Sequence, residues 1–378
     1  MCIRDRLMDA RFGHFAEKLE KDGDRVSTVY ARNAETGKYV KATASKGVIL
    51  ATGEYSSNPE FLKFFCPATV ENEIQVWWPD MDVEGKPVNQ GDGLKLGNWV
   101  GAAVQQHHAP MIHWMGGTYG GTGMDMSPVG TAPFLYLNKM CIRDRSAGAS
   151  AAADDATVNG DYPWPVNPPE IAAEDVEEEV SADIIIVGLG IAGVAAARSA
   201  VEEGASIIAF EKSEKPNVRS GDFAIMGGET MKRWGRENIV DIDEACDHEV
   251  EEGSYFPKRS IYTKWAKHSG EAFDWYLEAV PDIYYAESSI AEIPDGVEQY
   301  ITPYFVPLPD GYDFTKEAFP CYPSSVSCYP DQKFIFEANW DMVVGTGLMD
   351  ARFGHFAEKL EKDGDRVSTV YALSLIHI

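Results

Sequence analysis

Residues 7–31 (LMDARFGHFAEKLEKDGDRVSTVYA) recur without a single change at residues 348–372. Two identical segments would compete for one packing position, so this duplication constrains the fold more than any other feature of the chain. Repeat proteins stack units that diverge in sequence and normally number at least about three, which a single perfect pair does not match. We therefore interpret one copy as superfluous, and we expect the displaced copy to be exposed or disordered.

Each copy adjoins a hexapeptide that does not look like protein sequence. MCIRDR occupies residues 1–6 and 140–145, and LSLIHI occupies residues 373–378. The DNA string AGATGTGTATAAGAGACAG, translated from its third base, gives MCIRD and the first two bases of an Arg codon, and its reverse complement gives LSLIHI. This string resembles the transposon-end adapter of sequencing libraries, and such scars are excluded from fold reasoning. We expect fragments of one gene joined out of order, with a natural sequence that runs from Ser146 to Ala372 and continues from Arg32 to Lys139.

The composition is that of a strongly acidic globular protein. The chain has 378 residues, of which 44% are hydrophobic and 11% aromatic, enough for a packed core and for two domains. Its formal net charge is -27 at pH 7, which repels phosphate backbones and anionic lipid headgroups. It contains no apolar run of about 18 residues. We therefore expect no nucleic-acid partner and no membrane span.

The cysteines do not form a metal-binding pattern. Cys2 and Cys141 lie in the hexapeptides, and no C-x-x-C pair occurs among the others. Those others are Cys66, Cys246, Cys321 and Cys328. Their spacing gives no support for a metal site. Cys321 and Cys328 either form a disulfide in an oxidising compartment or remain isolated core thiols.

Residues 146–180 are Ala/Ser-rich, then Pro-rich, then acidic. Such a composition buries too little apolar surface to order itself, so we predict a disordered linker. A linker ahead of the first domain suits an exported, extracytoplasmic bacterial protein whose signal peptide lies outside this fragment. A cytoplasmic location is the alternative.

Hydrophobic patterns predict a βαβ unit between residues 182 and 211. The run ADIIIV (182–187) is continuous and β-branched, which is typical of a buried parallel strand. A glycine-rich turn follows, then an Ala-rich helix over 191–203 that ends at Gly204, then a second strand over 206–210.

Two other segments also predict β-structure. Residues 26–31 and 39–44 flank a turn and predict a hairpin, and residues 47–51 predict another buried strand.

Helical or irregular structure is predicted elsewhere. In the copied segment, Phe12, Phe15 and Leu19 fall at helical spacing before Asp22-Gly23. Residues 241–347 combine helical patterning near 261–279 with many prolines, and we predict an inserted, irregular segment there.

The turn at residues 188–193 (GLGIAG) matches G-x-G-x-x-G between the predicted strand and helix. Gly188 permits a tight turn, Gly190 lets the backbone approach a pyrophosphate, and Gly193 lets helix and strand pack closely. Glu211 stands at the end of the second strand, where an acid can accept hydrogen bonds from ribose hydroxyls. These features favour a dinucleotide site over the alternative, a structural glycine turn with a surface glutamate.

Five segments carry a resemblance to a known family. They are GLGIAGVAAA, FEK, RSGDFAIMGG, KGVILATGEYSSN and GDGLKLGNWVGAAV. Together they resemble the fumarate reductase and succinate dehydrogenase flavoproteins, which are FAD-dependent oxidoreductases, over nearly all of the reordered fragment. In that family the glycine turn comes first and the ATG segment later. This chain has ATG first, so the resemblance also supports the rearranged order.

The resemblance implies an α/β fold, circularly permuted in this chain. Its parts are a Rossmann-like FAD-binding domain, with a parallel sheet and a β-hairpin insert, and a partial capping domain. Residues 181–240 would form the N-terminal half of the FAD-binding domain and residues 7–65 its C-terminal half. Residues 66–139 would hold the end of the flavin domain and the start of the capping, substrate-binding region.

Carried over position by position, the resemblance implies several cofactor-binding residues. The ADP half of FAD would be held by Gly188, Gly190, Ala192, Gly193, Glu211 and Lys212. The flavin would lie against Ser220, Gly221, Gly227 and Gly228. Thr52, Gly53 and Asp92 would also approach the cofactor, although Glu54 stands where the family often has a second glycine. Covalent members have a histidine after the Arg-Ser pair, where this chain has Gly221, so we predict non-covalent FAD.

Counting from Gly101, His113 falls where the family has the histidine of its His-Pro-Thr motif, which binds a substrate carboxylate or carbonyl. Trp114 replaces the proline of that motif. The alternative role for His113 is a histidine hydrogen-bonded beneath the flavin. We predict no metal site at His107, His108 and His113, because no Asp, Glu or Cys with ligand-like spacing accompanies them.

The resemblance implies reduction of an activated C=C bond by hydride transfer from the flavin N5, with an arginine as proton donor. We expect that arginine beyond Lys139, so the fragment would be incomplete and inactive as written. The expected partners are a small-molecule substrate and an electron-donor protein. The alternatives are a flavin-dependent dehydrogenase of steroid or acyl substrates, a flavin electron-transfer module without substrate chemistry of its own, and a polypeptide whose parent gene alone has a function.

Overall fold

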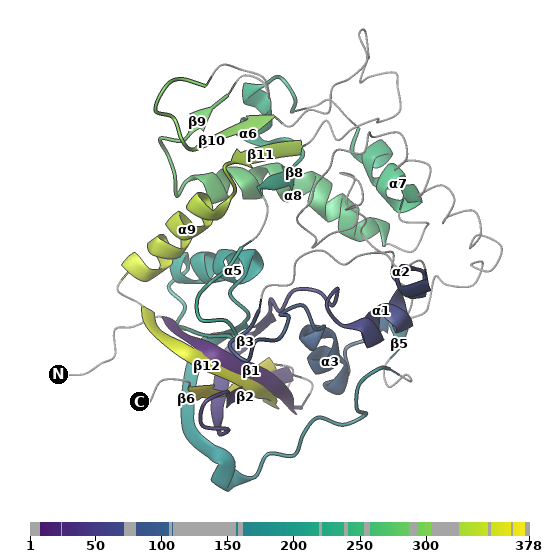
Figure 1. Cartoon of the computed structure of the whole chain (residues 1–378), viewed down its shortest axis with the longest axis vertical. Helices are drawn as coiled ribbons and strands as arrows, with labels where there is room; N and C mark the ends of the chain where they lie inside the picture. The colour runs from purple at the N-terminus through teal and green to yellow at the C-terminus, as the bar shows by residue number, and fades with distance from the viewer. Residues whose placement is uncertain are drawn as a thin grey trace. The chain divides into compact units, whose positions relative to one another are not determined.

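The computed structural model divides the chain into two compact units (Figure 1). The first consists of Met1–Asn217 with Val343–Ile378, and the second of Val218–Met342. The structure describes residues 8–23, 25–71, 81–105, 108, 156–157, 162–218, 221–237, 241–252, 258–286, 293–303, 325–346, 349–363 and 366–374.

The main sheet of the first unit is a closed barrel with strands from both ends of the sequence (Figure 1). Its strand order is β1-β12-β13-β2-β3-β6-β7, and β1 pairs with β2 as well. The strands are β1 (Met8–Asp22), β2 (Arg25–Asn33), β3 (Tyr39–Leu50), β6 (Val176–Val187), β7 (Ile207–Glu211), β12 (Met349–Asp363) and β13 (Arg366–Ser374). The sheet therefore joins the segments that precede Thr52-Gly53 and the glycine turn.

The predicted strand, turn, helix and strand between residues 182 and 211 are confirmed. β6 is followed by α5 (Ile191–Glu202), and β7 pairs with β6 in parallel, with Val187 opposite Phe210. Gly204 has a φ of 73°, which ends the helix as predicted because a glycine adopts this conformation without strain. The local sequence is enough to predict this unit, because the apolar run of β6 and the helix-forming residues of α5 favour the same structure as the pairing of β6 with β7.

The predicted hairpin is confirmed, and its second strand extends further than expected. β2 pairs antiparallel with β3, and β3 then continues as a parallel neighbour of β6 with Leu50 opposite Val187. One strand therefore covers both the second hairpin strand and the separate strand predicted at 47–51. The expectation of full burial is wrong at Ile49 and Leu50, each 37% exposed.

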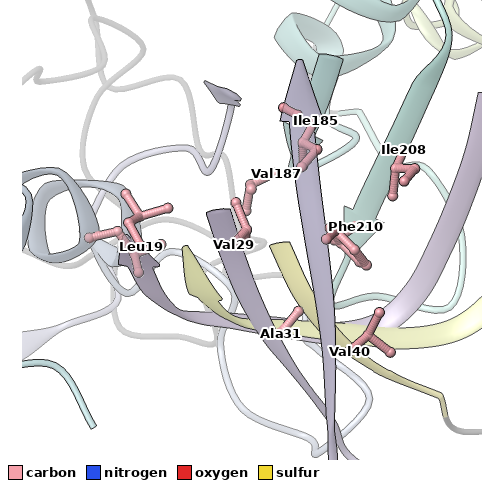
Figure 2. Packing of buried hydrophobic residues seen from close by; sticks show 11 residues of the cluster. Leu19, Val29, Ala31, Val40, Ile185, Val187, Ile208 and Phe210 are labelled. Atoms are coloured by element: carbon pink, nitrogen blue, oxygen red, sulfur yellow. The ribbon is translucent and has the colours of Figure 1, made fainter. Parts of the chain in front are cut away.

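The barrel core is formed by apolar side chains from β1, β2, β3, β6 and β7, together with Leu96 (Figure 2). Figure 2 labels Leu19, Val29, Ala31, Val40, Ile185, Val187, Ile208 and Phe210. Burying a Val, Leu, Ile or Phe side chain contributes about 1.5–3 kcal/mol, so this cluster holds strands of remote sequence together.

The helix predicted for the copied segment is wrong. Residues 8–22 form strand β1, whose first half pairs with β7 and whose second half pairs with β2. Residues 10–14 are buried without a break, and Gly13 has a φ of 69°, which an α-helix does not allow. Tertiary pairing along β1 therefore overrides the helical spacing of Phe12, Phe15 and Leu19.

The expectation that one copy is disordered is also wrong. Both copies form hairpins, and every residue pair of β12 with β13 repeats a pair of β1 with β2, including the positions of both register shifts. β12 runs parallel to β1, with Met349 opposite Met8 and Arg352 opposite Arg11. Identical positions of the two copies lie opposite each other at residues 8–11 and 18–19, and the register is shifted by one residue at Gly13 and His14.

Deleting residues 349–374 is expected to leave the first unit folded. The cycle β7-β1-β2-β3-β6 closes through direct pairings without β12 and β13, so the second hairpin adds to a ring that is already complete. Circular dichroism melts of the shortened chain should therefore show a cooperative transition. Deleting residues 8–22 together with 349–374 removes both copies of this strand, which opens the ring, and this comparison should lose that transition. Loss of folding in both deletions contradicts a dispensable duplicate.

The linker predicted at 146–180 is corrected at its second half. Trp164 is 9% exposed and lies 5.0 Å from the Phe61 ring and 4.5 Å from the Tyr162 ring, centroid to centroid. A short 3-10 helix over Ala173–Asp175 leads into β6, which begins at Val176. The average composition of this segment gave no indication of the packed Tyr162 and Trp164 side chains or of the start of β6. Residues 146–155 and 158–161 lie outside the described part.

Short helices and a strand pair complete the first unit. They are α1 (Pro59–Phe65), α2 (Pro67–Glu71), α3 (Asp92–Trp99), β4 (Val104–Gln105) and β5 (Ala156–Thr157), with β4 antiparallel to β5. Asn58 caps α1 by accepting hydrogen bonds from the N–H groups of Glu60 and Phe61.

The second unit begins at Val218, earlier than the boundary predicted at residue 240. The segment predicted as irregular at 241–347 contains regular structure, including the expected helix near 261–279 as α8. A four-stranded sheet has the order β8-β11-β10-β9. The elements are β8 (Asp222–Ala224), α6 (Gly228–Arg233), α7 (Ile242–Glu252), α8 (Arg259–Leu277), β9 (Tyr284–Tyr285), β10 (Tyr300–Pro303), β11 (Ser325–Tyr329) and α9 (Lys333–Gly345).

Two further sequence expectations concern thiols and membranes. Cys328 is a buried free thiol, and burial raises the pKa of that thiol above its ordinary value. Cys321 lies outside the described residues. Among the helices that the structure describes, none is long and apolar enough to cross a bilayer.

Candidate functional site

Three parallel strands of the first unit end in one row. Leu50 of β3 lies opposite Val187 of β6, which lies opposite Phe210 of β7. The Ala51 N–H donates to the Val187 carbonyl at 2.7 Å, and the Gly188 N–H donates to the Phe210 carbonyl at 2.7 Å. The segments after these strands therefore emerge at one edge, which we call the carboxyl edge: residues 51–53, 188–190 and 211–212. The carboxyl ends of parallel strands are where α/β sheets, open or closed into a barrel, bind ligands.

Close packing accounts for two of the three motif glycines. Gly188 has a φ of 94°, and a Cβ there would lie 2.4 Å from the Ala51 carbonyl oxygen. A Cβ at Gly193 would lie 2.0 Å from the Gly188 carbonyl oxygen. Any side chain at either position would strike backbone, so these glycines are required whether or not a ligand binds.

Gly190 is different, because the protein itself leaves room for a side chain there. Its φ is -74°, and the nearest atom to a Cβ would be the Asn217 carbonyl oxygen at 3.8 Å. Gly190 is the N-cap of α5, and no side chain caps that helix. The first-turn N–H groups, including that of Ala192, and the helix dipole are thus arranged as in known phosphate sites. The open cradle at Gly190 fits a diphosphate that approaches the backbone.

Glu211 braces the glycine turn in this structure. Its Oε2 accepts a hydrogen bond from the Leu189 N–H at 2.6 Å, and its Oε1 accepts one from the Ser213 N–H at 2.8 Å. Each carboxylate oxygen has a second lone pair, so these bonds leave acceptor capacity for a ribose hydroxyl. The ribose role stays a prediction.

The structure brings Thr52, Gly53 and the Gly-Asp-Gly segment together. A Cβ at Gly93 would lie 2.2 Å from the Thr52 Oγ1, so the start of α3 packs directly on Thr52. A Cβ at Gly53 would lie 3.6 Å from the Asn89 Oδ1. Residues that sequence reasoning assigned to the cofactor from three separate motifs thus meet at the carboxyl edge.

Asp92 and Lys212 form an ion pair at this edge. The Lys212 Nζ donates to the Asp92 Oδ2 at 3.0 Å, and the Lys95 Nζ donates to the Asp92 Oδ1 at 3.2 Å. Burial alone would raise the pKa of Asp92, but Lys212 and then Lys95 outweigh it and hold that pKa well below its ordinary value. Asp92 is therefore a carboxylate at every physiological pH. Lys95 was not predicted, because its i,i+3 spacing from Asp92 is common on exposed helices.

The other predicted site residues lie in the second unit or outside the described residues. Gly221 and Gly228 lie in the second unit, where a Cβ would strike the Cys328 carbonyl oxygen at 2.5 Å and the Gly270 backbone at 2.8 Å, respectively. Gly227 has a φ of 71° with open space around it. Packing explains two of these glycines, so their flavin role stays a prediction. Ser220 and His113 lie outside the described residues.

Sequence reasoning missed a tyrosine–histidine contact beside the carboxyl edge. The Tyr55 hydroxyl lies 2.6 Å from the His108 Nδ1, and the His108 ring stacks on Phe65 with centroids 4.2 Å apart. Burial raises the pKa of Tyr55 above its ordinary value. Within the described ranges, no three His, Cys, Asp or Glu side chains are grouped to hold a metal ion. His107 lies outside those ranges.

Comparison with known proteins identifies a related domain in the first part of the chain. Residues 3–117 match the family described as FAD binding domain. A digoxin reductase from Eggerthella lenta is 29% identical to the chain over 111 residues, which is 28% of this chain and 20% of that protein. The chain thus spans about a fifth of the length of this curated relative. The family match includes Thr52, Gly53 and Asp92, and the pairing of β3 with β6 connects it to the glycine turn.

Proposed function

We propose, from the match of residues 3–117 to the FAD binding domain family, that the chain is part of an FAD-dependent oxidoreductase that reduces an activated C=C bond. The observation that carries the proposal is the convergence of three motifs at the carboxyl edge, with an open cradle at Gly190. The resemblance to the fumarate reductase and succinate dehydrogenase flavoproteins supports the same cofactor.

The chain's own residues would bind and orient the cofactor. The N–H groups at the start of α5 would hold the diphosphate, and Glu211 keeps the glycine turn fixed to the end of β7. Thr52 and Gly53 would close the site from the β3 side. The flavin, once an electron donor has reduced it, would supply the hydride for reduction of the substrate.

Reconstitution with FAD tests the cofactor and its attachment. The purified chain should retain one flavin through gel filtration, and acid precipitation should release it and leave a colourless pellet, because no histidine follows Ser220. A chain that stays colourless after reconstitution contradicts FAD binding. A pellet that stays yellow contradicts non-covalent attachment alone.

The direction of the reaction is a finer part of the proposal. The Eggerthella lenta relative is a digoxin reductase, which supports reduction. The product of the intact parent gene should oxidise a reduced viologen dye when an enoate is added. Dye reduction with saturated steroid or acyl substrates instead favours a dehydrogenase. A flavin that exchanges electrons with dyes but with no substrate favours an electron-transfer module.

We also propose a rearranged gene and an exported parent protein that receives electrons from a donor protein. The two identical hairpins and the order of the family motifs support the rearrangement, with Ser146–Ala372 followed by Arg32–Lys139 in the natural gene. Sequencing reads mapped across Lys139 and Met140 test it. Continuous coverage by reads without the adapter string contradicts it.

A further inference from the structure

Lys212 is joined to residues 83–92 by three contacts. Its Nζ donates to the Asp92 Oδ2 at 3.0 Å and to the Val88 carbonyl oxygen, and its own carbonyl oxygen accepts from the Val83 N–H at 3.2 Å. The Lys212 side chain is 16% exposed. An ammonium group has three N–H donors, and the Lys212 ammonium donates two hydrogen bonds to residues 83–92.

Residues 81–92, which we call the edge loop, form a compact turn that closes on itself. The Asp82 Oδ1 accepts from the N–H groups of Glu84 and Lys86 at 2.9 Å each, and the Asp82 N–H donates to the Lys86 carbonyl at 2.8 Å. The turn is therefore rigid within itself. Its place in the molecule depends on what anchors it.

The edge loop is anchored on its other side to the segment after β3. The Gly91 N–H donates to the Glu54 carbonyl at 3.1 Å, and the Ser57 N–H donates to the Asn89 carbonyl at 3.0 Å. The loop thus spans from the end of β7, at Lys212, to the segment that follows Gly53. It links two of the three segments that make up the carboxyl edge.

We infer that Lys212 is a positioning residue: its ammonium group holds Asp92 and the edge loop against the end of β7 and is not itself a phosphate ligand. This rests on the proposed function, because the loop borders the proposed FAD site. Asp92, which also accepts from Lys95, offsets the charge of Lys212, and two of the three Lys212 N–H donors are directed at the edge loop. The phosphates are left to the backbone N–H groups of α5.

Amide hydrogen exchange without FAD tests the anchor directly. In Lys212→Met, exchange at residues 83–91 should rise about tenfold, because the loop loses both contacts with the Lys212 side chain and keeps only the Val83 N–H bond to the Lys212 backbone. Asp92→Asn should show a similar rise, and the double variant should show no further rise. Lys212→Arg should restore protection. The control is Lys215→Met, which removes an exposed lysine of the same segment and should leave exchange unchanged. Unchanged exchange in Lys212→Met overturns the inference.

FAD affinity in the same variants separates positioning from direct binding. If Lys212 acts through Asp92, the double variant should bind FAD about as weakly as the weaker single variant. Additive losses, with a smaller salt dependence in Lys212→Met, mean that the ammonium contacts phosphate directly and overturn the inference. Failure of the unaltered chain to bind FAD removes the proposed function only, because the exchange result in the absence of FAD stands by itself.

Discussion

Gly190→Ala is expected to fold like the unaltered chain and to bind FAD at least about tenfold more weakly, a loss of ~1.4 kcal/mol. A Cβ at this position has no protein atom closer than 3.8 Å, so the protein itself accepts it. Alanine at an N-cap costs about 1 kcal/mol or less relative to glycine, which leaves the fold intact. The methyl group would instead occupy the space through which a diphosphate reaches the backbone. Thermal melts and quenching of flavin fluorescence measure the two effects.

Two matched variants make this result specific. Gly193→Ala forces a Cβ against the Gly188 carbonyl oxygen at 2.0 Å and should destabilise the fold by about 3 kcal/mol or more. Gly47→Ala, where a Cβ meets nothing within 4 Å, should change neither folding nor affinity. If Gly190→Ala binds FAD as tightly as the unaltered chain, the turn at 188–193 is a structural feature with no ligand.

Glu178→Ala should lower the free energy of unfolding by about 2–3 kcal/mol. Arg11 is fully buried, and its guanidinium donates to Glu178 through two nitrogens, at 2.6 and 3.0 Å, and to Asp9 at 2.9 Å. Burial alone would lower the pKa of Arg11, but Asp9 and Glu178 outweigh it and raise that pKa. Removing Glu178 leaves a buried charge only half compensated. The cost stays below that of a fully buried pair because the Glu178 side chain is 36% exposed.

Denaturant melts of Glu178→Ala and Glu179→Ala measure this effect with a neighbour as the control. Glu179 is on the exposed face of β6, so its removal should change stability by less than about 0.5 kcal/mol. Glu178→Gln, which keeps the shape and loses the charge, should fall between them. Equal stability of all three variants shows that Arg11 does not depend on Glu178.

The parts of the fold that sequence predicted well are those in which local pattern and tertiary pairing agree. The sequence pattern predicts the observed element in three places: the apolar run before Gly188, the Ala-rich helix and the strand that ends at Glu211. The approach of Thr52 to Gly188 came only from resemblance, because these residues lie more than a hundred positions apart. The Lys212–Asp92 pair has no sequence signal for the same reason.

The failed predictions have physical causes of the same kind. Phe12, Phe15 and Leu19 are spaced for a helix, but β7 and β2 supply hydrogen-bond partners along β1 that a local pattern does not contain. The second half of the predicted linker is ordered by Trp164 packing on Phe61 and by Glu178 pairing with Arg11. The average composition of residues 146–180 does not show that single residues such as Trp164 and Glu178 make ordering contacts.

The central claim is that the carboxyl edge of β3, β6 and β7 binds FAD through the backbone of the glycine turn. Amide hydrogen exchange of the full chain with and without saturating FAD tests it most directly. The account predicts slower exchange on FAD addition at residues 188–193 and 52–53, with little change in β10 and β11. A chain that binds FAD without any protection at residues 188–193 contradicts it.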